Sequence, residues 1–407
     1  MQIEKKAKKI LKKPICDHCL GRQFAQLLTG ISNRARGRII RNVMAMAYET
    51  KKDLDIDKSN LHDTKIRNET FEKKKCSVCD DFFQDLDKWV KKIKNKMENI
   101  GFSTFLVGTK LNNKLLQNEE KLWEMVGINW CEPIKAEINR EVGKIIEKST
   151  NKTVNLKKPQ VNFILNIPKD KVNLEINPLF IYGEYQKLKR GIPQTKWPSG
   201  KYKTSVEEII ARPFMKASKA TGHVFHGMGR EDIDAKCLGH RPFVLELKIP
   251  KKRKLKIKKL SEKIDEKKVK VRNWKFSSKN EVVRIKSEQP DKTYKAIVKS
   301  EKNLKKKDLK KLKELENETI EQQTPKRVSH RRSDKIRKRE VKKIKTKYIN
   351  PKKFELIVKG EAGLYIKELI SSDDQRTNPS VSQKLNSQCE CKQLDVIKIN
   401  NKQKKKH

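Results

Sequence analysis

The sequence lacks any apolar run of the about 18–20 residues that a membrane-spanning helix needs. Residues 1–16 (MQIEKKAKKILKKPIC) also lack the apolar core of a secretory signal peptide. We therefore expect a soluble, cytoplasmic protein with no membrane partner. Apolar residues make up 35% of the 407-residue chain, less than the ~45–50% of an average domain but enough to form hydrophobic cores.

Acidic residues are scarce beside basic ones. The chain has 51 Asp and Glu against 99 Lys and Arg, a formal net charge of +48. Such a surface repels itself unless a polyanion neutralises it, so nucleic acid is the expected partner class. The charge is clustered, with 14 basic and 3 acidic residues in 248–275 and 14 basic and 2 acidic residues in 326–353. Lysine also accumulates on solvated faces for solubility alone, which is the alternative explanation.

Glycine-rich nucleotide-binding loops are also missing. The chain has neither a dinucleotide fingerprint nor a Walker lysine loop, so no organic cofactor is expected. The segment His226–Asp234 (HGMGREDID) instead places Arg230 and Asp232 two residues apart in a flexible turn. An aspartate beside a guanidinium keeps the negative charge that a nucleophile or base needs. Surface Arg–Asp turns are common, however, so this turn alone does not identify a catalytic site.

The eight cysteines include two Cys-x-x-Cys pairs. Cys16 with Cys19 and Cys76 with Cys79 could supply four thiolates to one ion, which is the closed geometry of structural zinc. Redox-active or unpaired buried thiols are the alternatives, and His18 could replace one cysteine as a ligand. The isolated Cys131 and Cys237 are expected to be buried small hydrophobes, and the pair Cys389 and Cys391 is assigned no metal.

The pattern of helices and strands divides the chain into three regions: 1–80 with both cysteine pairs, 81–175, and 176–407. The second region alternates helices and strands and predicts a compact α/β domain. The third has many strand-like runs alternating with basic helices, which predicts an α+β fold with a mostly antiparallel sheet. Residues 300–318 are expected to form a Lys/Glu helix that is solvated or lies against RNA. The predicted elements are helices at 85–99 and 134–148 and strands at 102–108, 160–167, 171–176, 223–226, 243–249, 294–299, 354–358 and 394–399.

Ordered motifs along most of the chain resemble one enzyme family. They are Cys16–Phe24 (CDHCLGRQF), Pro178–Tyr185 (PLFIYGEY), Arg190–Thr195 (RGIPQT), Arg230–Asp232, Gln323–Val328 (QTPKRV), His330–Arg332 and Gly363–Ile370 (GLYIKELI). In these blocks the chain resembles the archaeal and eukaryotic tRNA pseudouridine synthases that modify uridines 54 and 55 in the TΨC arm.

The resemblance implies a fold and a set of site residues. It implies a catalytic domain at 176–407 with a pseudouridine-synthase-type mixed sheet and flanking helices, a THUMP-like RNA-binding domain at 81–175 and a zinc-knuckle region at 1–80. Gly229–Asp232 matches the family's Gly-Arg-x-Asp turn, so Asp232 is the expected catalytic carboxylate, with Arg230 paired to it and Asp234 as a weaker competitor. Tyr294 would stack on the target base, and Ile366 would pack beneath the site.

The resemblance also implies a reaction. Isomerising uridine to pseudouridine breaks the N1–C1′ bond and joins C1′ to C5, with no redox change and no organic cofactor. The target base must be extruded from its loop, and stacking on Tyr294 would offset part of that cost. The expected partner is the TΨC arm of tRNA, and no protein partner is predicted. The alternatives are a catalytically inactive tRNA-binding or tRNA-folding protein and a different RNA-modifying enzyme.

Two departures from the family pattern fall near the expected site. The loop between Asp234 and Phe243 differs from the usual sequence and is one residue shorter. Ser372 and Gln375 stand where the family usually has glycine. These changes affect local loop geometry and leave the Arg230 and Asp232 motif intact.

Overall fold

The structure, a computed structural model, describes residues 2–51, 54–64, 66, 69–331 and 333–400. Its contacts group the chain into two compact units, Met1–Asn177 and Pro178–His407. The predicted boundary at residue 80 is not tested by this grouping and stays a prediction. Arg332 of the motif His330–Arg332 lies outside the described residues.

The N-terminal unit contains a four-stranded sheet, counted over the described residues, with the order β2-β1-β3-β4. Strand β1 runs parallel to β2 and β3, and β4 runs antiparallel to β3. Alternate residues of β1, including Phe105 and Val107, are buried against α6, whose Ile138, Val142 and Ile146 recur at helical spacing. The predicted α/β pattern of this region is confirmed. Its elements are α4 (Leu86–Met97), β1 (Thr104–Lys110), α5 (Asn113–Val126), α6 (Ile134–Ser149), β2 (Thr153–Val154), β3 (Val161–Asn166) and β4 (Lys171–Ile176).

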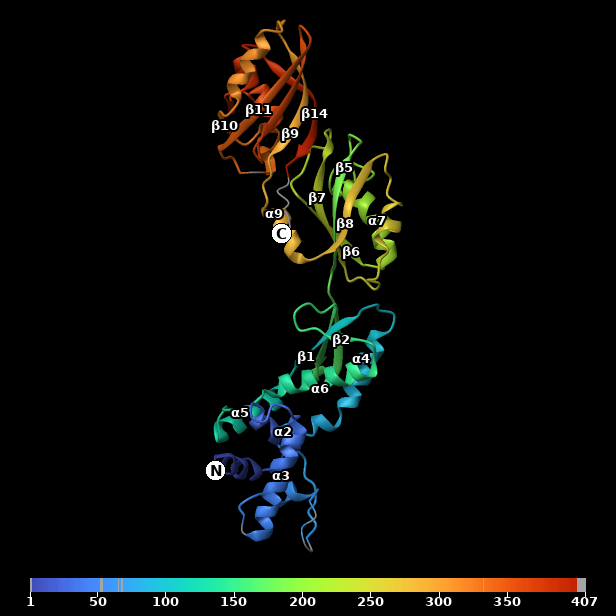
Figure 1. The fold of residues 1–407 in the computed structure, drawn as a ribbon, viewed down its shortest axis with the longest axis vertical. Helices are drawn as coiled ribbons and strands as arrows, with labels where there is room; N and C mark the ends of the chain where they lie inside the picture. The colour runs from blue at the N-terminus through green and yellow to red at the C-terminus, as the bar shows by residue number, and fades with distance from the viewer. Residues whose placement is uncertain (1, 52–53, 65, 67–68, 332, 401–407) are drawn as a thin grey trace. The chain divides into compact units, whose positions relative to one another are not determined.

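The cysteine-bearing segments pack into the same hydrophobic core as this sheet. Here α1 (Gln2–Leu11), α2 (Asp17–Gly21) and α3 (Asn33–Thr50) lie close together (Figure 1). Two glycines permit the crossing of α2 and α3: a Cβ on Gly21 would lie 1.9 Å from the Asn33 carbonyl oxygen, and one on Gly37 would lie 1.9 Å from that of Asp17. Any larger residue at either position would force the helices apart.

The C-terminal unit is built on a mixed sheet of ten strands within the described residues. Its order is β13-β10-β11-β12-β9-β14-β7-β5-β8, with β6 paired to β7, and only the β14–β7 pairing is parallel. The predicted mostly antiparallel α+β fold is therefore confirmed. The strands are β5 (Leu179–Lys187), β6 (Gly222–Gly227), β7 (Lys236–Lys248), β8 (Val269–Ser277), β9 (Lys292–Ser300), β10 (Thr319–Gln322), β11 (Arg337–Asn350), β12 (Lys353–Gly360), β13 (Thr377–Asn378) and β14 (Cys389–Ile399).

Two hydrophobic cores lie on the two halves of this sheet, which meet at the short β14–β7 pairing (Figure 1). In one half, α7 (Val206–Ser218) packs on β7 and β8, with the Phe214 and Trp274 ring centroids 5.1 Å apart. In the other half, α10 (Ile366–Ser371) buries Leu369 and Ile370. The remaining helices are α8 (Ile257–Ser261), α9 (Lys279–Ser287) and α11 (Val381–Lys384).

Two expectations for the basic segments are wrong. The segments between the predicted strands were expected to form basic helices, but strands β8 and β11 lie in two of these segments and carry exposed lysines. Residues 300–318 do not form a solvated α-helix, since Asp308–Leu315 is a 3₁₀ helix with Leu309, Leu312 and Leu315 buried. A spacing of three matches the three residues per turn of a 3₁₀ helix, so one apolar face forms without the α-helical pattern.

No helix among the described residues combines the length and the apolar composition needed to cross a bilayer.

Candidate functional site

A cavity of about 860 Å³ opens in the C-terminal unit. The turn between β6 and β7, strands β9, β11 and β14, and the start of α10 all contribute to its wall, so both halves of the sheet take part. We call it the central cavity. Its lining includes all four side chains expected at the catalytic site: Arg230, Asp232, Tyr294 and Ile366.

Asp232 lies in the turn before β7, and 32% of its side chain is exposed. Its Oδ1 atom accepts a hydrogen bond from Arg327 Nη1 at 3.2 Å, and its Oδ2 atom lies 3.4 Å from Lys367 Nζ. Two cations from distant parts of the chain therefore hold this carboxylate at the cavity wall.

The expected pairing of Asp232 with Arg230 is not found. Arg230 is exposed, and within the described residues it forms no ion pair. Glu231, which lies between them in the sequence, points inward, and its side chain is fully buried. Arg230 and Asp232 lie on the outer side of the turn and form no ion pair with each other. Arg327 takes the place expected for Arg230.

Glu231 anchors this turn from behind. Its carboxylate accepts a hydrogen bond from the Tyr185 hydroxyl at 2.9 Å and forms an ion pair with Arg241, with Nε 3.0 Å from Oε2. Lys187 Nζ lies 3.7 Å from its other oxygen. All these side chains are buried, and a buried carboxylate is stable only with such partners.

The backbone carbonyls of the turn are held by the same group of side chains. Lys187 Nζ donates to the Asp232 carbonyl at 2.9 Å, Gln194 Nε2 donates to that of Gly229 at 2.9 Å, and Arg241 Nη1 donates to that of Met228 at 2.8 Å. Burial lowers the pKa of Lys187, while the charge of Glu231 opposes that effect. The position of Asp232 is thus fixed through its own backbone as well as its side chain.

A second network holds the two cations of the site. Arg327 Nε donates to buried Glu368 at 2.6 Å, and Lys367 Nζ donates to Asp234 at 2.8 Å. Burial acts to lower the pKa of both cations, but the carboxylates of Glu368 and Asp232 raise that of Arg327, and those of Asp234 and Asp232 raise that of Lys367. Both side chains therefore remain charged beside Asp232.

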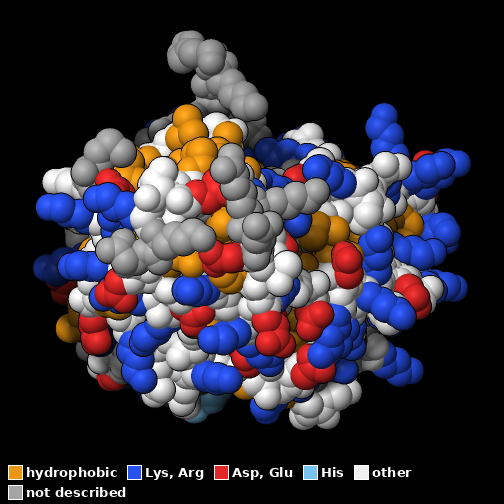
Figure 2. Space-filling model, turned by 90° about the horizontal axis from the view of Figure 1, so that it is seen from below, with side chains coloured by type: hydrophobic (Ala, Val, Ile, Leu, Met, Phe, Trp, Pro, Cys, Tyr) orange, Lys and Arg blue, Asp and Glu red, His pale blue; other side chains and the backbone are white. Residues whose placement is uncertain are grey.

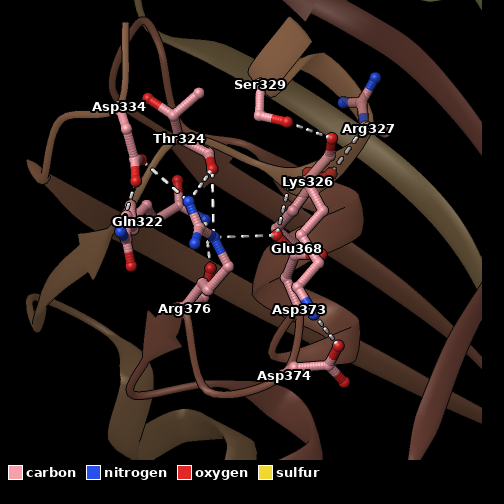
Figure 3. Close-up of polar contacts among 12 residues, drawn as sticks. Gln322, Thr324, Lys326, Arg327, Ser329, Asp334, Glu368, Asp373, Asp374 and Arg376 are labelled. Atoms are coloured by element: carbon pink, nitrogen blue, oxygen red, sulfur yellow. Dashed lines mark hydrogen bonds and ion pairs between the residues drawn. The ribbon is translucent and has the colours of Figure 1, made fainter.

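Figure 3 shows the loop that carries Arg327. Arg376 donates to the Thr324 carbonyl at 2.8 Å and to Asp334 at 2.8 Å, and the Lys326 amide donates to Asp373 at 3.0 Å. These bonds tie Thr324, Lys326 and Asp334 to the segment after α10, so Arg327 and Lys367 approach Asp232 as one assembly.

Neither Arg327 nor Lys367 was expected at the site from the sequence. Both stand inside quoted motifs, Arg327 in Gln323–Val328 and Lys367 directly after Ile366. The available signal was a basic residue in each motif, but nothing local indicated that either would meet Asp232.

Tyr294 and Ile366 both line the central cavity, the first from a strand and the second from a helix. Tyr294 lies on β9 and packs against Cys237, Val396 and Ile399. Burial raises the pKa of its phenol to about 12, so the ring stays neutral. Ile366 begins α10 and is almost fully buried. The cavity therefore combines a carboxylate, two cations, an aromatic ring and an aliphatic side chain.

The four expected metal ligands lie together in the N-terminal unit. The Sγ atoms of Cys16, Cys19, Cys76 and Cys79 all fall within 4.8 Å of one another, and those of Cys16 and Cys79 are 3.6 Å apart. Four thiolates around a tetrahedral ion with Zn–S bonds of about 2.3 Å would stand about 3.8 Å apart. The donor set and its spacing therefore fit zinc.

Charged side chains surround this cysteine cluster. The fully buried Arg22 donates to Cys19 Sγ at 3.4 Å, which would offset part of the negative charge of four thiolates around one dication. His18, considered as a substitute ligand, hydrogen-bonds Glu137 at 2.8 Å and stacks on Phe83. These contacts hold the His18 ring outside the cysteine cluster.

Basic side chains project from the face of the molecule shown in Figure 2, with acidic side chains among them. On β11, Lys343, Lys345 and Lys347 are exposed along one strand. Such lysines suit contact with a phosphate backbone.

Comparisons with known proteins match both units. The family model described as "Pus10, C-terminal" matches residues 180–400, and the model "Pus10 THUMP domain, archaeal" matches residues 89–166. Among curated relatives, the tRNA pseudouridine synthase Pus10 of Methanocaldococcus jannaschii is 41% identical over 96% of this chain and 93% of that protein. That of Pyrococcus furiosus is 39% identical over 98% of both.

Similarity to solved structures is weaker. A chain in "Crystal Structure of a Cbf5-Nop10-Gar1 Complex" shares 17% identity with a TM-score of 0.33, covering 53% of this chain and 48% of that one.

Proposed function

The chain belongs to the Pus10 family of tRNA pseudouridine synthases, which makes it an isomerase, and we propose that it converts uridines 54 and 55 in the TΨC arm with Asp232 as the catalytic carboxylate. The observation that carries the residue assignment is the position of Asp232 in the central cavity, paired with Arg327 and Lys367. The choice of the TΨC arm rests on the motif resemblance.

The reaction needs one carboxylate near the sugar of an extruded nucleotide. Asp232 either attacks C1′ or removes the proton from C2′, and in both routes the N1–C1′ bond breaks and C5 later bonds to C1′. Arg327 and Lys367 hold the carboxylate in place, so little reorganisation is needed when the substrate arrives. A cavity of about 860 Å³ lies within the range of sites that hold small ligands, and it is large enough to admit one extruded nucleotide.

The other cavity side chains bind the target nucleotide. Tyr294 stacks on the uracil ring, which recovers about 1–3 kcal/mol of the cost of extruding the base. Ile366 supports the site from beneath, and the exposed Arg230 contacts a phosphate at the cavity mouth.

The cysteine cluster holds a structural zinc ion. All four positions would be filled by protein thiolates, so the ion would stabilise the N-terminal unit and activate no water. Residence in the cytoplasm and the absence of a protein partner stay predictions from sequence.

Tritium release from tRNA labelled at C5 of uridine tests the proposal, because C5 loses its hydrogen when it bonds to C1′. We expect release by the wild-type protein and none by Asp232→Asn, which should still bind tRNA. Asp234→Asn is the matched control, two residues away and largely exposed, and should keep most of the activity. Transcripts with cytidine in place of uridine at position 54 or 55 then show which of the two uridines is modified.

Release by Asp232→Asn would remove this residue from the catalytic role. Binding of tRNA without release by the wild-type protein would favour the inactive tRNA-binding alternative.

A further inference from the structure

Lys292 is a partly buried cation in the wall of the central cavity that the proposed mechanism does not use. It is the first residue of β9, two positions before Tyr294, so both side chains lie on the same face of the strand. Within the described residues, the Lys292 side chain makes no hydrogen bond or ion pair, in contrast to the side chains of Lys187 and Lys367 nearby.

Its ammonium group lies beside the catalytic turn. A Cβ atom placed on Gly229 would be 3.2 Å from Lys292 Nζ and 3.2 Å from Arg241 Nη1. Gly229 is three residues before Asp232, and Tyr294 is close enough to Asp232 for that carboxylate to raise the tyrosine pKa, after burial as the larger cause. The ammonium, the phenol ring and the carboxylate therefore face one space.

A partly buried ammonium without a protein acceptor is free to bind a ligand, and a ligand carbonyl that reaches it forms a charge-assisted hydrogen bond there. Uracil offers two carbonyl oxygens to such a donor. We propose that Lys292 is a catalytic residue that donates a hydrogen bond to a uracil carbonyl oxygen and stabilises the negative charge formed on the ring when the N1–C1′ bond breaks. This inference rests on the proposed function of the cavity.

The step balances without a further reactant. The electron pair of the N1–C1′ bond stays on uracil, whose charge spreads over N1 and the two carbonyl oxygens, while Lys292 keeps its proton. The sugar is held as an ester of Asp232 or has lost its C2′ proton to that residue. When C5 bonds to C1′, the ester is released or the C2′ proton returns, C5 loses a proton and N1 gains one, so the product is an isomer of the substrate.

The protonation of Lys292 gives the proposal a pH signature. Burial lowers the pKa of Lys292 to about 8, and Arg241 on β7 acts in the same direction, whereas Cys237 on β7 and Glu231 in the turn act against it. The ammonium is present below pH 8 and is lost above it. In the free enzyme, kcat/KM should therefore fall as the pH rises through 8.

Three variants test the role in single-turnover tritium release at saturating tRNA. Lys292→Met should lower the rate about 100- to 1,000-fold, as loss of a donor to a developing anion does in other enzymes. Its Kd for tRNA should change less than about threefold, since only the transition-state contact is lost. Lys292→Arg should recover much of the rate. Lys299→Met, an exposed lysine on the same strand, should match the wild type.

The pH profile supplies a second readout. Lys292→Arg should lose the fall of kcat/KM near pH 8, because a guanidinium stays charged there, while titration of the RNA affects both enzymes equally. A wild-type rate in Lys292→Met, or weaker tRNA binding with an unchanged saturating rate, would overturn the proposal, the latter by assigning Lys292 to a phosphate. Absence of release by the wild-type protein would instead refute the proposed function.

Discussion

Glu231 and Arg241 form a fully buried ion pair directly behind the turn that carries Asp232, with 3.0 Å between Nε and Oε2. The pair explains why the residue next to Asp232 is charged although its side chain is shielded from solvent. Arg241 also donates to the Met228 carbonyl, so one guanidinium links β7 to the start of the turn and to Glu231 within it.

Replacing Glu231 with Gln should destabilise the C-terminal unit by about 3 kcal/mol, because Arg241 would stay buried without a counter-charge. Urea unfolding followed by tryptophan fluorescence measures this change. Glu4→Gln removes an exposed ion-pair partner and should leave the unfolding midpoint unchanged. An equally small effect at Glu231 would mean that the buried pair is not structural.

Replacing Arg327 should destabilise the protein more than replacing Lys367, although both side chains contact Asp232. Arg327→Met leaves buried Glu368 unpaired and should lower the free energy of unfolding by about 2 kcal/mol. Lys367→Met leaves mainly the exposed Asp234 unpaired and should lower it by less than about 1 kcal/mol. Both variants should lower kcat, and Lys367→Arg should restore most of it. Full activity in Lys367→Met would show that Arg327 alone holds Asp232.

Cys76→Ser should lower the zinc content of the purified protein from about one ion per chain and reduce the thermal stability of the N-terminal unit. Elemental analysis and thermal unfolding measure the two effects. Cys131→Ser, at a partly buried cysteine outside the cluster, should keep the metal. Native protein without zinc would contradict the four-thiolate site.

Gln375→Gly should stabilise the protein by about 0.5–1 kcal/mol. Gln375 is exposed, and its φ of 66° lies in the left-handed region, where a side chain is strained and glycine is not. Ser372, the other position where the family usually has glycine, has a φ of 71°. Gln375→Ala keeps the strain and should give no gain in a matched urea titration.

Affinity for tRNA should fall steeply with salt, because lysines that neutralise phosphates release bound counterions. If about six phosphates are contacted, Kd should rise about 10³-fold between 50 and 200 mM salt. Filter binding across that range measures the slope, and replacing Lys343 and Lys345 by Met should flatten it. A slope near zero would mean that the basic segments are only solvated.

Regular elements with apolar periodicity were predictable from sequence. Strand β4 has the predicted bounds Lys171–Ile176, and α6 differs from its prediction by one residue. Strand β11 was missed, because its lysines hide the apolar residues that it buries, such as Val341 and Ile344. The 3₁₀ helix at Asp308–Leu315 was missed because its leucines follow a spacing that the α-helical pattern does not contain.

The sequence by itself determined the basic character of the protein, the two cysteine pairs and the short motifs that carry Asp232, Tyr294 and Ile366, because each is a property of neighbouring residues. Only the tertiary structure decided that Arg327 and Lys367, rather than Arg230, meet Asp232, and that Glu231 turns inward. Charged side chains pair only when they lie a few ångströms apart. Residues that are distant in the sequence come that close only after the sheet has folded.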